Sequence, residues 1–202
     1  RLSATTVDSL RALFGPARER SAKKQLDRLD AHCRRLIGLS PFMVLATTGP
    51  DGLGDVTPRG DAPGFVTVED DRTLLIPDRP GNNRLDILTN ILAHPGIGLL
   101  FLIPGMDETL RVNGTAEILD DADLTARFAI AGKLPKTVLR VAVREAYLHC
   151  AKALMRSRLW DPAVQIDRST LPSMGEMMRD QIGLATAETQ AEMLERYRAT
   201  LY

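Results

Sequence analysis

The stretch LLIPDRPGNNRLDILTNILAHPGIGLLFLI, residues 74–103, decides the fold class because it changes from strand to helix and back to strand. It opens with an apolar run, crosses a loop of prolines, glycine and asparagines, and continues in RLDILTNILA with the apolar spacing of a helix. His94 and Pro95 then end a helix of about three turns, because a residue before proline avoids the helical region. The final IGLLFLI is predicted to be a fully buried strand.

The segments around this stretch have the texture of an antiparallel sheet. Runs rich in Val, Thr, Leu and Ile are separated by Gly, Pro and Asp, which is typical of hairpins. The last two runs, residues 108–119 and 137–150, are long. Gly114, within the first of these two, is the expected position of a bulge. The other predicted strand regions are FMVLATT (42–48), DVTPRGDAPGFVTVEDDRTLLIP (55–77), ETLRVNGTAEIL (108–119) and TVLRVAVREAYLHC (137–150). We therefore expect a mainly β fold with flanking helices (α+β), a closed or half-closed barrel of six to seven antiparallel strands.

Helical patterns at both ends divide the chain into three parts. Residues 1–40 are predicted to be an N-terminal helical extension, in which residues 21–38 form one amphipathic helix. Residues 41–165 are predicted to form the barrel domain. Residues 166–202 are predicted to be a helical tail packed on the barrel or on a dimer mate, with Met174, Met177 and Met178 in core packing.

Composition excludes several classes of partner. The 202 residues carry 26 Lys and Arg against 26 Asp and Glu, so no bulk positive charge attracts nucleic acid or a membrane surface. No apolar run approaches the roughly 20 residues of a membrane span. The N-terminal residues lack the order of a signal peptide, so a cytoplasmic location is expected. Adjacent His and Cys at 32–33 and at 149–150 point apart on a helix, so no metal site is expected.

Two regions have the residues of an anion site. In PDRPGNNRLDIL (77–88), free N–H groups at a helix N-terminus, the capping types Asn82 and Asn83, and Arg84 would suit a phosphate. The alternative is an ordinary capped helix with a surface arginine. In VTPRGDAPGF (56–65), glycines beside Arg59 would let a ligand approach the backbone closely. Arg111 is a third candidate, or else a cross-strand ion-pair partner.

In this order, VTPRGDAPGF, LLIPDRPGNNRLDIL, NILAHPGIGLLFLI and LRVNGTAEIL resemble the pyridoxamine 5'-phosphate oxidase-like family of FMN-binding split barrels. The later AYLHCAKALMRSRLWDP is similar to a subgroup in which this segment completes the flavin site of the partner subunit. The resemblance covers roughly residues 40–165. It implies a homodimer with FMN at the subunit interface and a small-molecule substrate or electron donor.

The resemblance also implies which residues hold FMN. Arg59, Arg84 and the two asparagines would hold the phosphate and ribityl chain, and Arg111 would approach the ring edge. The full implied set is Arg59, Gly60, Asp61, Ile76, Pro77, Asp78, Asn82, Asn83, Arg84, Arg111 and, from the partner subunit, residues equivalent to Lys152, Arg158 and Trp160. Guanidinium donors suit a dianionic phosphate, and an apolar slot suits the ring.

Function within this resemblance stays open between two classes. The first is an FMN-dependent oxidoreductase in which the flavin supplies the chemistry and no catalytic side chain is identified. The second is a flavin-binding or flavin-sensing protein without turnover, or a binder of haem or a deazaflavin on the same barrel. The tail after Asp161 has no match to the Arg/His group that grips substrate phosphate in true pyridoxamine-phosphate oxidases, so that specific activity is not expected.

Overall fold

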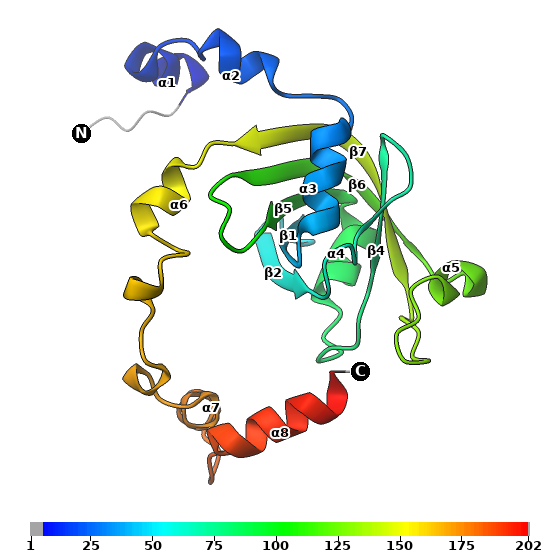
Figure 1. Ribbon diagram of the computed structural model, residues 1–202, viewed down its shortest axis with the longest axis vertical. Helices are drawn as coiled ribbons and strands as arrows, with labels where there is room; N and C mark the ends of the chain where they lie inside the picture. Colours follow the sequence, from blue (N-terminus) through cyan, green and yellow to red (C-terminus); the bar gives the residue numbers. More distant parts are fainter. Residues whose placement is uncertain (1–5, 202) are drawn as a thin grey trace.

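The computed structural model describes residues 6–201, so residues 1–5 and 202 of the predicted terminal parts lie outside the described chain. Its centre is one sheet of seven strands in which every pairing is antiparallel (Figure 1). The strand order is β2-β1-β5-β6-β7-β4-β3. The strands are β1 (Phe42–Thr48), β2 (Gly54–Gly60), β3 (Thr67–Val68), β4 (Thr73–Pro77), β5 (Gly96–Leu102), β6 (Thr109–Leu119) and β7 (Val138–His149). The predicted class, a seven-stranded antiparallel sheet with flanking helices, is confirmed.

Helices surround this sheet and extend from both of its ends. Two of them, α3 and α4, lie against the strands, whereas α1 and α2 precede the sheet and α6 to α8 follow it (Figure 1). None of the helices in the described chain is long and apolar enough to span a membrane. The α-helices are α1 (Val7–Phe14), α2 (Glu19–Lys23), α3 (Ala31–Leu39), α4 (Asp86–Ala93), α5 (Ala122–Ala126), α6 (Lys152–Ser157), α7 (Met174–Ile182) and α8 (Gln190–Thr200), and the short 3-10 helices are η1 (Pro162–Val164) and η2 (Arg168–Thr170).

Alternation along the strands separates a core face from an outer face. Met43 and Leu45 of β1 are fully buried, and their neighbours Val44 and Ala46 are half-buried on the other face. The same alternation in β5 makes the prediction of a fully buried strand at 97–103 wrong, because only every second residue of it enters the core. The apolar sides of α3 and α4 close the core face.

A bulge between β6 and β7 confirms the expected irregularity at Gly114. The register shifts between Asn113 and Gly114, where β7 has one extra residue, Arg144. A Cβ on Gly114 would lie 2.2 Å from the carbonyl oxygen of Ala142. Only glycine lets the two strands approach this closely.

The predicted single helix over residues 21–38 is wrong. The chain forms α2, then an extended segment in which Leu26 pairs with Ala146 of β7 through two backbone hydrogen bonds, and only then α3. Asp30 starts α3 by accepting a hydrogen bond from the N–H of Cys33 at 2.8 Å. Leu26 pairs with a part of β7 that lies beyond the last pair of β7 with β4. This pairing outweighs the helical spacing of the apolar residues.

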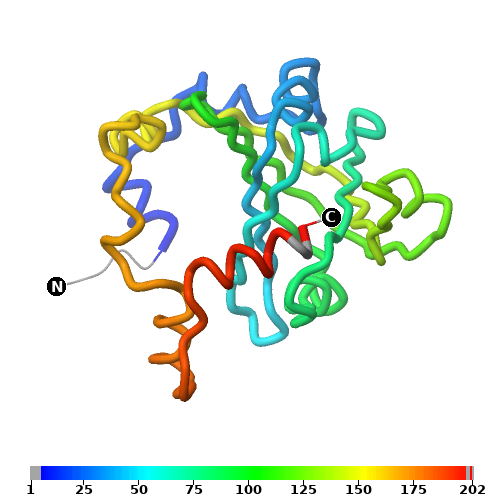
Figure 2. The backbone as a smooth tube through the Cα atoms, turned by 60° about the horizontal axis from the view of Figure 1, so that its bottom comes forward, coloured from blue at the N-terminus to red at the C-terminus, as the bar shows by residue number. Residues whose placement is uncertain are grey.

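The tail beyond β7 arcs away from the sheet instead of covering it (Figures 1 and 2). α7 packs against α8. Core packing for the methionine group is wrong in the single chain, because Met174 and Met178 are exposed and Met177 is half-buried. The tail presents a series of exposed apolar side chains, Met155, Leu159, Val164, Ile166, Leu171, Ile182, Leu184, Leu194 and Tyr197.

Candidate functional site

Two ion pairs join β2 to the segment that follows β4, and we call them the seam. Arg59 lies 3.5 Å from Asp78, and Arg79 donates to Asp61 at 2.9 Å. β2 is one edge of the sheet and β4 lies next to the other edge, so side chains close the barrel here without a backbone ladder between these two strands. The seam brings three predicted site residues together, Arg59, Asp61 and Asp78.

The Arg59–Asp78 pair lies at the end of the core face. Arg59 is paired in register with the buried Met43, and Asp78 continues the face of the buried Ile76. Burial raises the pKa of Asp78, and the positive charge of Arg59 offsets this only in part. The predicted neighbours Ile76 and Pro77 are buried within β4, and Gly60 ends β2. Arg59 therefore pairs with a carboxylate, Asp78, whose charged form is destabilised by burial.

Thr137 lies directly across from Asp78 and was missed by sequence reasoning. Its carbonyl oxygen accepts the N–H of Asp78 at 2.9 Å, which continues the β4–β7 ladder beyond Pro77 and Val138. Its Oγ1 is buried and has no hydrogen-bond partner. A strand-end threonine carries no sequence signal for such a role, so only the structure identifies it.

The start of α4 differs from the prediction that Asn82 and Asn83 cap it. The N-cap is Leu85, in a left-handed conformation with φ 61°, and no side chain caps the helix. Asn82 instead accepts the N–H of Arg84 at 3.1 Å, and Asn83 also has a positive φ of 58°. The side-chain oxygen of Asn82 bonds within the turn before the helix, so α4 starts only at Asp86. The N–H groups of its first turn therefore have no side-chain cap.

Arg84 and Arg59 do not share a partner in the single chain. Arg84 is exposed, and its Nε donates to Asp86 at 2.7 Å. The hydrogen bond and charge of Asp86 raise the pKa of Arg84, and the charge of Asp55 on β2 adds to this. The convergence of the two guanidiniums on one anion therefore stays a prediction that a ligand would have to complete.

Arg111 is the centre of a polar cluster on the outer face of the sheet. Its guanidinium donates to Glu145 at 3.0 Å and lies 5.0 Å from the ring of Tyr147. The same carboxylate accepts from Asn113 at 2.7 Å and from Gln25 at 2.7 Å. Of the two sequence interpretations of Arg111, the ion pair with a neighbouring strand is therefore present. Its Nε is nevertheless buried without a partner, so its donors are not exhausted.

The predicted residues around α6 lie apart from the seam. Trp160 donates its Nε1 to the carbonyl oxygen of Met106 at 2.9 Å, which ties the chain after α6 to the β5–β6 turn. Arg158 donates its Nε to Asp161 at 3.0 Å, and Lys152 is exposed at the first position of α6. The single chain does not bring these three residues to Arg59 or Arg84.

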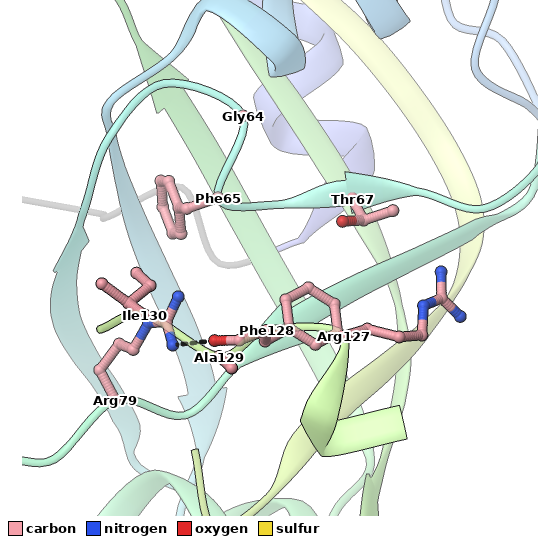
Figure 3. Close-up of a pocket in the computed structure, with 8 residues that line it drawn as sticks. All are labelled: Gly64, Phe65, Thr67, Arg79, Arg127, Phe128, Ala129 and Ile130. Atoms are coloured by element: carbon pink, nitrogen blue, oxygen red, sulfur yellow. Dashed lines mark hydrogen bonds between the residues drawn. The ribbon is translucent and has the colours of Figure 1, made fainter. Parts of the chain in front are cut away.

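A hollow of about 390 Å³ lies beside the Arg79–Asp61 pair of the seam (Figure 3). The Arg79 guanidinium stands in it beside Ile130 and donates to the carbonyl oxygen of Phe128 at 2.6 Å. Arg127 turns away from Arg79 and pairs with Glu69 at 3.2 Å. Both cations are engaged by protein groups, so this hollow is a structural support of the seam. No cluster of three metal-binding side chains occurs among the described residues.

Comparison with known proteins identifies one family. A family model described as pyridoxamine 5'-phosphate oxidase matches residues 29–150, which is more than half of the chain. No curated protein sequence matches.

Several solved structures are similar. HupZ of Group A Streptococcus is 19% identical, with 59% of this chain and 92% of that chain covered and a TM-score of 0.48. A Clostridium acetobutylicum protein related to general stress protein 26, of the pyridoxinephosphate oxidase family, is 14% identical over 58% of this chain and 85% of its own, with a TM-score of 0.46. An FAD binding protein of Mycobacterium smegmatis is 17% identical over 61% and 97%, with a TM-score of 0.44.

Proposed function

Because the chain belongs to the pyridoxamine 5'-phosphate oxidase family, we propose that it is a flavoprotein that binds FMN between two copies and acts as an oxidoreductase on a small molecule. The observation that supports this most directly is the distribution of the predicted site residues. Arg59 lies on the core face of the sheet, and Arg111 lies on its outer face, three strands away. A ligand that meets both kinds of residue would meet Arg59 of one copy and the Arg111 equivalent of the other.

The outer face of β2, β1 and β5 suits a second copy because its side chains are apolar. Val56 is 64% exposed and Phe42 is 39% exposed. Pro58, Val44 and Leu100 are directly paired across β2, β1 and β5 on this face. An exposed apolar surface of this kind is typical of a buried interface and is unfavourable in a monomer, and the tail adds a second set of exposed apolar side chains.

The donors present fit the parts of FMN. Arg59, Arg84 and the uncapped start of α4 would hold the phosphate, since guanidinium groups and helix N-terminal N–H groups both favour a dianion. The unpartnered Nε of Arg111 would donate to an edge of the ring system. Lys152, Arg158 and Trp160 on the tail are the groups that the partner subunit would add. When bound, FMN would supply the electron transfer.

This arrangement assigns to the protein the tasks of binding, orienting and excluding water. The apolar face of the partner would shield the ring, and Arg111 held by Glu145 would present one fixed donor to it. No side chain is assigned as a catalytic acid or base. A cytoplasmic location remains a prediction.

Titration of the purified protein with FMN tests the cofactor. We expect a yellow protein that bleaches with reductant and recovers in air, and Arg84→Ala should weaken FMN binding by about 1.5 to 3 kcal/mol, the value of a charge-assisted hydrogen bond. Arg140→Ala is the matched control, because Arg140 is also an exposed arginine paired with one carboxylate, Glu117. A protein that takes up no FMN would end the proposal. Anaerobic mixing with NADH or NADPH then distinguishes an enzyme linked to nicotinamide from a flavin binder without turnover.

Mixed dimers test the shared site. Arg59→Ala and Arg111→Ala chains should each bind FMN poorly as homodimers. If each site takes one arginine from each copy, a heterodimer isolated through two different tags has one intact site of two, so about half of the wild-type sites return. No recovery in the heterodimer would show that both arginines act within one chain or that one of them is not in the site.

A further inference from the structure

The unpartnered hydroxyl of Thr137 is the feature that the proposed site leaves unexplained. Buried polar side chains almost always have a hydrogen-bond partner, and removing one from water without a partner is unfavourable. In the described chain only two buried side-chain atoms lack one, Arg111 Nε and Thr137 Oγ1. The first already belongs to the proposed site.

Thr137 is placed beside the Arg59–Asp78 pair by the sheet itself. Its carbonyl oxygen accepts the N–H of Asp78 at 2.9 Å, so the two residues are opposite one another directly beyond the last pair of β4 and β7, Pro77 and Val138. Side chains at opposite positions lie on the same face, about 5 Å apart at Cβ. Two residues further along each strand, Ile76 and Leu139 are buried in the core, which identifies that face as the core face.

The hydroxyl has no charge, and it belongs to the residue opposite Asp78, the carboxylate partner of Arg59. A hydroxyl donates one hydrogen bond and accepts others, so it suits a phosphate oxygen or a polyol hydroxyl. Arg59 alone cannot satisfy all oxygens of a phosphate monoester. A neighbouring hydroxyl would supply a further donor with no second positive charge.

We propose that Thr137 is a further binding residue of this site, and that its hydroxyl hydrogen-bonds the phosphate-bearing polyol end of bound FMN. The inference rests on the proposed FMN function and adds to it a residue directly before β7 that neither the motifs nor the family resemblance indicated. It also gives a hydrogen-bond partner to a buried hydroxyl that has none within the protein.

Thr137→Val gives opposite effects on folding and binding. Valine keeps the β-branched shape and removes an unpaired buried hydroxyl, so the melting temperature of the FMN-free protein should be unchanged or higher. The dissociation constant for FMN should rise about two- to tenfold, the loss of one neutral hydrogen bond. Thr137→Ser keeps the hydroxyl and should bind FMN nearly as wild type does.

Thr125→Val is the matched control. Thr125 is also a buried threonine, but its hydroxyl donates to the carbonyl oxygen of Ala122 at 3.1 Å. Its replacement should lower the melting temperature and leave FMN binding unchanged.

Each outcome decides between the two proposals. If wild type and Thr137→Val bind FMN equally well, Thr137 is not in the site and the FMN proposal stands. If Thr137→Val lowers the melting temperature as Thr125→Val does, the hydroxyl has a partner within the protein and the inference is overturned. If wild type does not bind FMN at all, both proposals fall.

Discussion

Replacing Asp78 with asparagine should make the protein bind FMN more tightly. Asp78 is the carboxylate partner of Arg59 at 3.5 Å, and only about a quarter of each side chain is exposed, 22% and 25%. Burial raises the pKa of Asp78 more than Arg59 lowers it. A phosphate that binds Arg59 must therefore approach a charged carboxylate in a place where water screens the repulsion poorly.

The size of the effect follows from this geometry. A phosphate on Arg59 would lie about 6 Å from the Asp78 carboxylate, and at an effective dielectric constant of ~20 the repulsion is about 3 kcal/mol per unit charge. Reorientation of both groups reduces this, so a net gain of about 1 to 2 kcal/mol is expected. That gain corresponds to FMN binding about five- to thirtyfold tighter at pH 7.

The pH dependence of protein stability tests the same substitution independently of FMN binding. Because the folded-state pKa of Asp78 is raised, its contribution to stability is most favourable below the unfolded value of 3.8 and is lost as pH rises through the folded-state pKa. Asparagine does not titrate. The variant should therefore lack this decline, which urea unfolding between pH 3 and pH 7 would measure.

The assay is a fluorescence titration with FMN and with riboflavin, which lacks the phosphate. Asp78→Asn should improve FMN binding and leave riboflavin binding unchanged. Glu117→Gln is the matched control, because Glu117 pairs with Arg140 in an exposed position where water screens the charge, and its effect should stay below about threefold. A folded Asp78→Asn protein that binds FMN no better than wild type would refute the idea that this carboxylate competes with the phosphate.

Three further predictions concern the framework. Gly114→Ala should lower the free energy of unfolding by about 3 kcal/mol in urea titrations, because its Cβ would lie 2.2 Å from the Ala142 carbonyl oxygen, and an unchanged midpoint would contradict the bulge geometry. At pH 8 a thiol reagent should label the exposed Cys150 quickly, since the N–H and charge of Lys152 lower its pKa. The same reagent should leave Cys33 unlabelled until the protein unfolds, since burial raises the pKa of Cys33 to about 11. Equal labelling rates would show that α3 opens readily. Asn90→Leu should cost about 2 to 4 kcal/mol of stability by thermal unfolding, because Asn90 donates to Thr47 and to Asp55 at 3.0 Å each, and a fully stable variant would mean that these acceptors find other donors.

The strands could be predicted from the sequence because local chemistry and tertiary pairing agree there. Residues 42–48 form the predicted strand, and proline after His94 ends α4 as expected. The helix predicted over residues 21–38 failed for the opposite reason. Leu26 has a helical spacing to its neighbours, but a free backbone edge at Ala146, distant in sequence, offered it a strand partner.

The site could be predicted by residue type more than by arrangement. Arg59, Asp61 and Asp78 do lie together, but the pairing of Asp61 with Arg79 depends on which faces of two non-adjacent segments meet. Asn82 is a capping type, and it still bonds to the turn before the helix. Thr137 has no motif at all, because its interest comes from a missing partner that only three-dimensional packing reveals.

The seam would explain why the proposed ligand site lies at this end of the barrel. The strands β1, β5, β6 and β7 are joined by continuous backbone ladders, which a small molecule cannot enter without breaking many hydrogen bonds. Between β2 and the segment after β4 the connection consists of the pairs Arg59–Asp78 and Arg79–Asp61. Arg79 is also held by Phe128, so one pair is anchored on the side of the hollow, whereas the Arg59–Asp78 pair is opposed by the burial of its carboxylate. In the proposed site an anion would therefore exchange with Asp78 at Arg59 while the second pair keeps the barrel closed, so the ligand would enter at a side-chain contact and leave the sheet intact.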